Sequence, residues 1–302
     1  MIIVTGASGA FGRAAAARLM QRLPPTELLL TTRTPEKFAD LAALGAQVRR
    51  ADFDDPTSLD KAFAGGTKML LISTARVGTR VAQHANAIAA AVRSGVRHIA
   101  YTSVLGAAEP GNPALVKLDH RATEEILERS GASWTFLRDS QYAEAIAGAM
   151  VPGALAAGRI PDNAHDGKVA FVSRDDCVAC ATEVLLASGH ENRAYDITGP
   201  ELMTIADALA EASRIAGKPI VVERVDDEGM LAHFDSLGIA RHASDVVPAG
   251  PIPWSSDDMV TFGRSIREGY FDRLTPHVKQ ITGQSPRPLR DVLLAHRHLW
   301  PV

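Results

Sequence analysis

The first twelve residues constrain the fold more than any other part of the chain. A short apolar and β-branched run at 1–5 leads into Gly-Ala-Ser-Gly-Ala-Phe-Gly at 6–12 and then into an alanine-rich run. A strand, a glycine turn and a helix in that order are typical of the first βαβ unit of a dinucleotide-binding sheet. Glycine permits the tight turn and the close approach of phosphate oxygens, and amides at the helix start favour negative charge. The alternative is that the glycines form only a turn. The pattern favours a pyrophosphate site made by Gly6, Ser8, Gly9, Ala10, Phe11 and Gly12.

Strands and helices alternate over the first 140 residues. Expected strands cover 1–5, 27–32, 47–51, 68–72, 97–102 and 133–137, and expected helices cover 13–21, 35–44, 56–64, 79–94 and 115–129. Strands separated by helices pair in parallel, because each crossover returns the chain to the same end of the sheet. The prediction is an α/β fold, a doubly wound parallel Rossmann sheet of order 3-2-1-4-5-6, which forms an NAD(P)-binding domain over 1–140.

The alternation stops near residue 140. Beyond it, short strands are expected over 169–172, 194–198 and 219–225, helices over 175–187, 204–216, 227–237 and 257–268, and a loop rich in proline and glycine over 247–254. This mixture predicts a smaller mixed α/β substrate-binding lobe over 141–302, interleaved with the first domain.

Composition excludes several classes of function. The 302 residues carry a net charge of −3, so there is no electrostatic reason to expect nucleic acid binding. No stretch has the length of a membrane-spanning helix and the N-terminus lacks the regions of a signal peptide, so a cytoplasmic location without membrane contact is predicted. The two cysteines, Cys177 and Cys180, are interpreted as small buried residues. No metal site is expected, because no further ligands stand at matching spacing.

Polar residues at the ends of the strands complete the predicted cofactor site, because ligands of a doubly wound sheet bind at the carboxyl edge. After the second strand, where an NAD-preferring site would have a carboxylate, Arg33 and Lys37 predict NADP(H) in preference to NAD(H). The alternative for Arg33 is a surface side chain that only closes the strand. The later strand ends assigned to the cofactor are Asp52 and Phe53 for the adenine, Ser73, Thr74 and Ala75 for the nicotinamide ribose, and Thr102 and Ser103 beside them.

Several short motifs together resemble the NmrA-like family of atypical short-chain dehydrogenase/reductases. They are the glycine pattern, Thr-Thr-Arg-Thr-Pro-Glu-Lys at 31–37, Asp52-Phe53, Gln83-His84, Gly-Val-Arg-His-Ile-Ala-Tyr-Thr-Ser at 95–103, and His120 with Thr123-Glu124. Within that family the chain is most similar to the NADPH:quinone oxidoreductase and triphenylmethane reductase branch, over the first 200 residues and again at 281–291. The resemblance implies a Rossmann fold, bound NADPH and reductase activity.

The helix expected over 115–129 departs from the wider superfamily, in which a catalytic tyrosine precedes a lysine by four residues and that lysine precedes a glutamate by four. Counting back from Glu124 places His120 at the lysine position and Val116 at the tyrosine position. The quinone reductase branch resembles this chain in having the histidine. Ser103 and His120 are therefore predicted to be catalytic, by binding and polarising the acceptor's oxygen, and His120 is also assigned to the cofactor.

The end of the sixth strand supplies the predicted substrate contacts. The similar branch typically has Arg-Asn-x-x-Tyr there, whereas this chain has Arg-Asp-Ser-Gln-Tyr at 138–142. Asp139 and Tyr142 are predicted to bind substrate, and Asp139 brings a negative charge where the branch has a neutral amide. A buried structural role is the alternative for Tyr142.

The leading functional hypothesis is an NADPH-dependent oxidoreductase that delivers hydride to a quinone-like, enone or other conjugated aromatic acceptor. The absent tyrosine agrees with such a substrate, because a conjugated acceptor delocalises the charge that hydride brings. One alternative is a regulator that senses NADP(H) without turnover. Another is a lyase or isomerase that retains its nicotinamide cofactor. The expected partner is a small molecule, and the chain is expected to be a monomer or homodimer.

Overall fold

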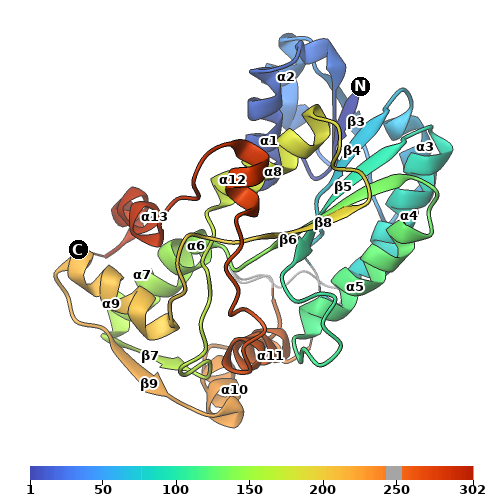
Figure 1. Ribbon diagram of the computed structural model, residues 1–302. Helices are drawn as coiled ribbons and strands as arrows, with labels where there is room; N and C mark the ends of the chain where they lie inside the picture. Colours follow the sequence, from blue (N-terminus) through green and yellow to red (C-terminus); the bar gives the residue numbers. More distant parts are fainter. Residues whose placement is uncertain (76, 243–253, 302) are drawn as a thin grey trace.

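The computed structural model describes residues 1–75, 77–242 and 254–301, which contain one seven-stranded parallel sheet (Figure 1). The strands are β1 (Ile2–Val4), β2 (Leu28–Thr32), β3 (Gln47–Arg50), β4 (Lys68–Leu71), β5 (His98–Val104), β6 (Ser133–Asp139) and β8 (Arg193–Ile197). Their order is β3-β2-β1-β4-β5-β6-β8, and each neighbouring pair is parallel. The predicted order 3-2-1-4-5-6 is confirmed, and β8 extends the sheet beside β6.

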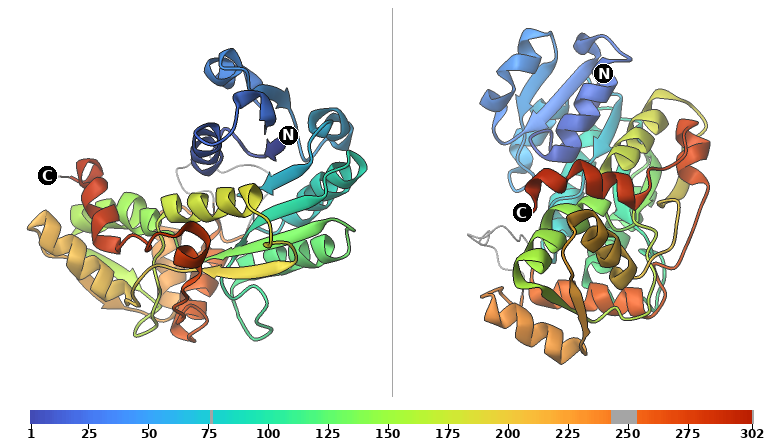
Figure 2. Two further views of the ribbon diagram at one scale, coloured as in Figure 1. Left: turned by 45° about the horizontal axis from the view of Figure 1, so that its top comes forward. Right: turned by 90° about the vertical axis from the view of Figure 1, so that its left-hand side faces the viewer.

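Helices cover both faces of this sheet (Figure 1 and Figure 2). On one face α1 (Ala10–Met20) packs beside α8 (Arg174–Leu186), and on the other α3 (Pro56–Phe63), α4 (Arg80–Arg93) and α5 (Leu115–Glu128) pack in a row. Because the central strands are buried on both faces, β1 and the start of β2 are continuous apolar runs rather than alternating ones. The result is one apolar core under α1 and α8 and another under α3 to α5.

A second group of elements follows β6 and has an apolar core of its own. It contains α6 (Ala143–Ala145), the π-helical turn η3 (Ile146–Met150), α7 (Val151–Ala157), α9 (Ile205–Ala216), α10 (Asp227–Ser236), α11 (Ser256–Arg267), α13 (Leu289–Ala295) and η4 (Arg297–Leu299). A two-stranded parallel sheet joins β7 (Arg159–Asp162) to β9 (Val221–Arg224), and α12 (His277–Thr282) returns to pack on α8. Figure 1 shows this group at the end of the main sheet where β6 finishes.

Some expected elements differ from the structure. The predicted strand over 169–172 joins no sheet in the described part of the chain and forms only single bridges, from Val172 to Tyr142 and from Val169 to Met203. Its apolar run reflects burial between two cores, and burial produces the same sequence pattern as a strand. The helix expected over 35–44 is a 3-10 turn, η2 (Pro35–Phe38), followed by a short α2 (Ala39–Ala43).

Other elements were not expected from the sequence or cannot be compared with it. The helical segment 143–157 contains a π-helical turn that interrupts the α-helical period, and α12, α13 and the turn η1 (Pro25–Glu27) are too short to show one. The loop expected over 247–254 lies outside the described residues apart from Trp254. No helix within the described ranges is long and apolar enough to cross a membrane.

Candidate active site

The glycine loop has the geometry of a phosphate-binding turn. Gly6 has a φ of +56°, which an L side chain rarely adopts. A Cβ at Gly12 would lie 2.5 Å from the Gly6 carbonyl oxygen, so only glycine allows α1 to pack this closely on the turn. Gly9 precedes α1, and within the described chain no side chain caps the helix and no acidic residue occupies its first turn. Ser8, Gly9 and Ala10 are exposed, so an anion can approach the start of α1, where the first helical amides have no partner inside the helix; the Gly9 amide itself donates to the Gly6 carbonyl.

Cations surround the turn that follows β2. Arg33 and Lys37 are exposed there, as the sequence predicts for residues that meet a 2′-phosphate. The structure adds Arg13, from the first turn of α1, which the sequence analysis missed. Its guanidinium lies 4.6 Å from the centroid of the Phe38 ring and donates to the Lys37 carbonyl over 3.2 Å. Asp40 lies 3.6 Å from Arg13 and balances part of this charge.

The ends of β3 and β4 are held by helix α4. The Phe53 carbonyl accepts from Asn86 Nδ2 at 2.9 Å, and Asp52 Oδ1 accepts from the backbone of the same turn. After β4, the Thr74 amide donates to His84 Nε2 at 3.1 Å. The turn also contacts β5, since the Ser73 amide donates to Thr102 Oγ1 at 2.9 Å.

His120 lies in the interior with both ring nitrogens occupied. Arg80 Nη1 and His120 Nε2 are 2.8 Å apart, and because a guanidinium can only donate, Nε2 accepts and Nδ1 carries the proton. That proton points to the Tyr101 hydroxyl, 2.9 Å away. Burial, followed by the charge of Arg80, holds the pKa of His120 well below its ordinary value. His120 is therefore a neutral residue whose single proton is used within the protein.

Arg80 is a buried cation that the sequence analysis missed. It precedes His84 by four residues, which places both on one face of α4. This spacing is visible in the sequence and is the signal that could have identified Arg80. Its guanidinium lies 3.7 Å from Asp119 on α5 and donates to the Ala75 carbonyl at 3.2 Å. Asp119 also accepts from the Gly78 amide at 2.6 Å, so the turn after β4 is fastened to α5.

The start of α5 is capped by residues far away in the sequence. The Val116 amide donates to Asp258 Oδ1 and the Leu115 amide to Thr261 Oγ1, each over 3.1 Å. Both acceptors belong to α11. Burial raises the pKa of Asp258 to about 6 against the opposing effect of Arg80. Helix α11 thus satisfies the first amides of the helix that carries His120.

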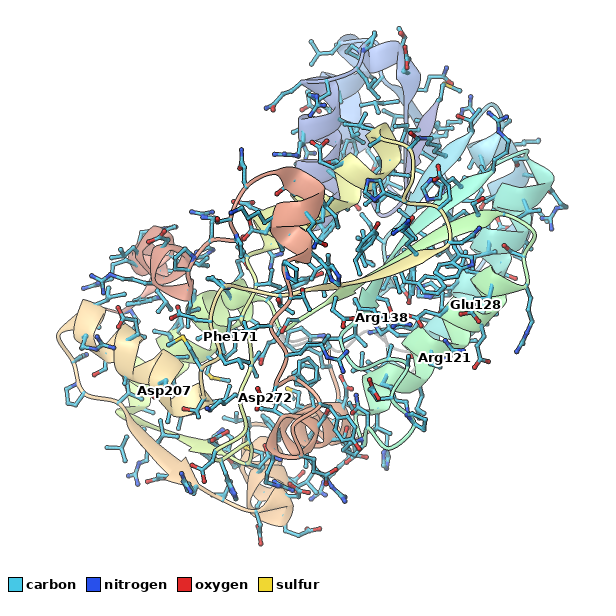
Figure 3. The ribbon with its side chains drawn as sticks, viewed as in Figure 1. Arg121, Glu128, Arg138, Phe171, Asp207 and Asp272 are labelled. Carbon is cyan, nitrogen blue, oxygen red and sulfur yellow. The ribbon has the colours of Figure 1, made fainter. Side chains whose placement is uncertain are left out.

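Ser103 is fixed by a buried carboxylate. Its hydroxyl donates to Glu124 Oε1 at 2.7 Å, and Arg138 donates to both oxygens of the same carboxylate at 2.9 and 2.8 Å. Arg121 approaches Glu124 Oε2 at 3.3 Å, and Figure 3 marks both arginines on the α5 side of the sheet. The only proton of Ser103, like that of His120, is directed to another protein group.

Asp139 and Tyr142 form a pair on the opposite face of the sheet, against α8. The Tyr142 hydroxyl donates to Asp139 Oδ2 over 2.7 Å. Asp139 is only 4% exposed, and its Oδ1 has no hydrogen-bond partner among the described residues. Burial raises the pKa of Asp139 to about 7, although contacts with Tyr142 and Cys177 oppose the shift.

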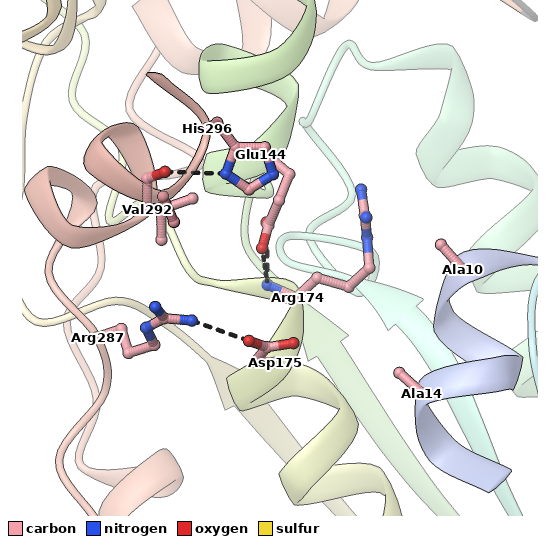
Figure 4. A pocket seen from close by; sticks show the side chains of 9 residues that line it. Ala10, Ala14, Glu144, Arg174, Asp175, Arg287, Val292 and His296 are labelled. Carbon is pink, nitrogen blue, oxygen red and sulfur yellow. Dashed lines mark hydrogen bonds and ion pairs between the residues drawn. The ribbon is translucent and has the colours of Figure 1, made fainter. Parts of the chain in front are cut away.

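A cavity of about 220 Å³ lies beside the glycine loop, between α1, α6, α8 and α13 (Figure 4). Arg174, at the start of α8, extends across it toward Ala10 in Figure 4, and its guanidinium carbon is 5.7 Å from the centroid of the Tyr142 ring. Glu144 on α6 accepts the Arg174 amide at 3.0 Å. No pattern in the sequence singled out Arg174, because its importance depends on how α8 meets the glycine loop.

Comparison with known proteins agrees with this geometry. Residues 6–188 match the family described as NAD(P)H-binding. Quinone oxidoreductase 2 of Escherichia coli is 35% identical over 88% of this chain and 93% of that protein. The chain belongs to this NAD(P)H-binding, NmrA-like family. The crystal structure of the E. coli NADPH-dependent quinone oxidoreductase QOR2 complexed with NADPH matches with a TM-score of 0.87 and 32% identity, covering 99% of each chain.

Two further relatives widen the comparison. The crystal structure of Citrobacter sp. triphenylmethane reductase complexed with NADP(H) matches with a TM-score of 0.85 and 29% identity, over 98% of this chain and 100% of that chain. The (4-alkanoyl-5-oxo-2,5-dihydrofuran-3-yl)methyl phosphate reductase of Streptomyces griseus is 30% identical over 98% of both proteins. This NmrA-like protein is accordingly an NAD(P)H-dependent reductase.

The residues of the NmrA-like site fit a nicotinamide dinucleotide. Thr74 Oγ1, Ser140 Oγ and Gln141 Oε1 are buried side-chain atoms without a partner in the described chain, and all follow β4 or β6 at the carboxyl edge. Buried polar atoms normally have partners, and ribose hydroxyls and a carboxamide could supply them. Cys177 and Cys180 are free and buried as predicted, and the described residues contain no cluster suited to a metal ion.

Proposed function

We propose that this NmrA-like reductase uses NADPH to reduce a quinone-like, enone or other conjugated aromatic acceptor. The observation that carries the proposal is that neither the tyrosine position of α5 nor the two predicted catalytic residues presents a proton that is free for the acceptor. Val116 stands at the tyrosine position, and the His120 and Ser103 protons point to Tyr101 and Glu124. A simple ketone needs a strong donor as hydride arrives, whereas a conjugated acceptor delocalises the developing charge. The names of two relatives, a quinone oxidoreductase and a reductase of an unsaturated lactone, support the same class of conjugated acceptor.

We infer a preference for NADP(H) over NAD(H) from the cations after β2. Arg33 and Lys37 lie exposed within one turn of each other, and Arg13 reaches the same turn from α1. Charge-assisted bonds from guanidinium groups suit a 2′-phosphate. The support is the position of these three cations at the end of β2.

Each remaining part of the site has an assigned task. A bound nicotinamide supplies the hydride. The loop at 6–12 holds the pyrophosphate, Asp52 and Phe53 flank the adenine, and the turn at 73–75 accommodates the nicotinamide ribose. The assignment of Ser103 and His120 to the acceptor stays a prediction. It requires the Ser103 hydroxyl to leave Glu124 and the His120 ring proton to leave Tyr101, so that each can donate to the acceptor.

The test is consumption of NADPH by the pure protein, followed at the nicotinamide absorbance band with 1,4-naphthoquinone and a cyclic enone. The expected result is acceptor-dependent loss of absorbance that is faster with NADPH than with NADH. NADPH binding without turnover across the panel would favour the sensing regulator. Cofactor that copurifies and is not released would favour the lyase or isomerase. Cytoplasmic location and a monomeric or homodimeric state stay predictions.

A further inference from the structure

The surroundings of the Asp139 carboxyl group disfavour its ionised form. It ends β6 with 4% of the residue exposed, and within the described ranges Oδ2 alone receives an ordinary hydrogen bond, from Tyr142. The Cys177 thiol lies beside the carboxyl group but is a weak donor. A buried carboxylate with an unpartnered oxygen is unfavourable, whereas a neutral carboxyl group largely avoids this desolvation.

Among the residues that the structure describes, no cation pairs with this carboxyl group. Arg138, the residue before it, points to the other face of the sheet and pairs with Glu124. Arg174 lies over the Tyr142 ring rather than on the carboxyl group. Among the described residues, the titratable or charged groups that face the pair are Cys177, Cys180 and Arg174 on α8, while Asp176 on α8 and Arg18 on α1 act on the two cysteines.

The pair lies at the carboxyl edge of the sheet, where the cofactor of this family of folds binds. Tyr142 is half-buried between Asp139 and Arg174, and Arg174 forms one wall of the cavity beside the glycine loop. Burial and the Asp139 charge raise the pKa of the Tyr142 phenol well above its ordinary value, so the phenol keeps its proton. The pair can therefore hold two protons near the site.

We propose that, once hydride has converted the conjugated acceptor into a delocalised anion, Tyr142 donates the proton that completes its reduction and Asp139 resupplies Tyr142. The proposal rests on the proposed reductase function. With neutral Asp139, the carboxyl group donates to the Tyr142 oxygen and leaves the phenol proton directed at the acceptor. Tyr142 would be a catalytic residue and Asp139 a positioning residue that acts through it.

The proton and electron balance closes on groups already named. The hydride from the cofactor brings two electrons to the acceptor and leaves it as an anion. The phenol O–H bond breaks as the new O–H bond of the acceptor forms, and the carboxyl proton moves to the Tyr142 oxygen. Asp139 becomes a carboxylate and regains its proton from solvent before the next turnover.

Kinetics with 1,4-naphthoquinone test this pair through the variants Asp139→Asn and Tyr142→Phe. The wild-type kcat should fall as pH rises through about 7, because only neutral Asp139 resupplies the phenol. Each variant should lose about 10²-fold in kcat at pH 6, the lower end of the range for a positioned acid, with little change in KM. The Asp139→Asn variant should lack the falling limb, and the double variant should lose no more than either single one. Cys180→Ala, a packing change on α8, should keep the limb.

Infrared spectroscopy gives a second readout that needs no turnover. With NADP⁺ bound, the wild type minus Asp139→Asn difference should contain a carboxylic acid band that disappears near pH 7. Absence of that band at pH 5, or an unchanged falling limb in Asp139→Asn, would overturn the pair while leaving the reductase function intact. A wild type that reduces neither acceptor class would overturn the proposed function and the donor role with it.

Discussion

Replacing Asp139 by asparagine should change how the free energy of unfolding depends on pH. Burial raises the pKa of Asp139 from 3.8 to about 7 in the folded chain, and the unfolded chain has no such burial. Between these two values the folded protein keeps a proton that the unfolded chain has released. Unfolding then releases one proton, so this group makes the free energy of unfolding fall as pH rises.

The magnitude follows from the size of the shift. One pKa unit corresponds to about 1.4 kcal/mol, so roughly three units contribute on the order of 4 kcal/mol between pH 4 and 7. Below the unfolded value both states are protonated and above about 7 both are ionised, so the contribution is constant outside this window. Asparagine does not titrate. As pH rises across the window, the free energy of unfolding of the Asp139→Asn variant should therefore fall by about 1.4 kcal/mol less per pH unit than that of the wild type.

Urea unfolding of both proteins at several pH values from 4.5 to 8 provides the assay, with the linear slope held common to both. The difference between the two proteins removes every other titrating group, because those groups are shared. Any constant cost of the amide shifts one curve without changing its slope. Parallel curves between pH 4.5 and 6.5 would show that Asp139 is ionised in the folded protein, and the reasoning from its unpartnered oxygen would fail.

Three further predictions concern the cofactor loop and the network on α4 and α5. Arg33→Ser should weaken NADPH binding by about 1.5–3 kcal/mol and leave NADH nearly unaffected, as measured by fluorescence titration, and an equal loss for both would contradict the assignment. Gly9→Val should abolish binding of both cofactors while the chain still folds, since a Cβ there would lie 3.4 Å from the Gly6 carbonyl oxygen, whereas Gly12→Ala should destabilise the fold because its Cβ would lie 2.5 Å from that oxygen. By NMR the wild-type His120 ring should titrate below its ordinary pKa of about 6.5, and Arg80→Met should raise that pKa by removing the charge that assists burial, so an unshifted wild-type titration would refute the network.

The order of the main sheet was predictable because it depends on local signals. Apolar runs, helical periods and the glycine turn each involve neighbours in sequence, and parallel pairing follows from their alternation. The same local information led to the predictions that the loop at 6–12 and Arg33 bind the cofactor and that His120 stands at the lysine position of α5. The prediction of a strand over 169–172 was wrong, because local sequence does not distinguish a buried apolar run without strand partners from a strand.

The chemistry of the site was not predictable in the same way. Arg80 and His120 are 40 positions apart, yet their contact decides which ring nitrogen of His120 carries the proton. Val116 and Asp258 are 142 positions apart, yet their contact caps the start of α5. The resemblance indicates that Asp139 stands where the similar branch typically has asparagine, but the sequence does not show that α8 buries it with one oxygen unpartnered among the described residues.

Residue identity and spacing therefore determined the α/β class and the strand order of this protein, and they predicted where a dinucleotide binds. Only the tertiary structure decided which of its ionisable groups keep their protons and where those protons point. The physical reason is that a pKa or a hydrogen-bond direction depends on desolvation and on donors brought together from distant segments, and neither leaves a periodic mark in the sequence.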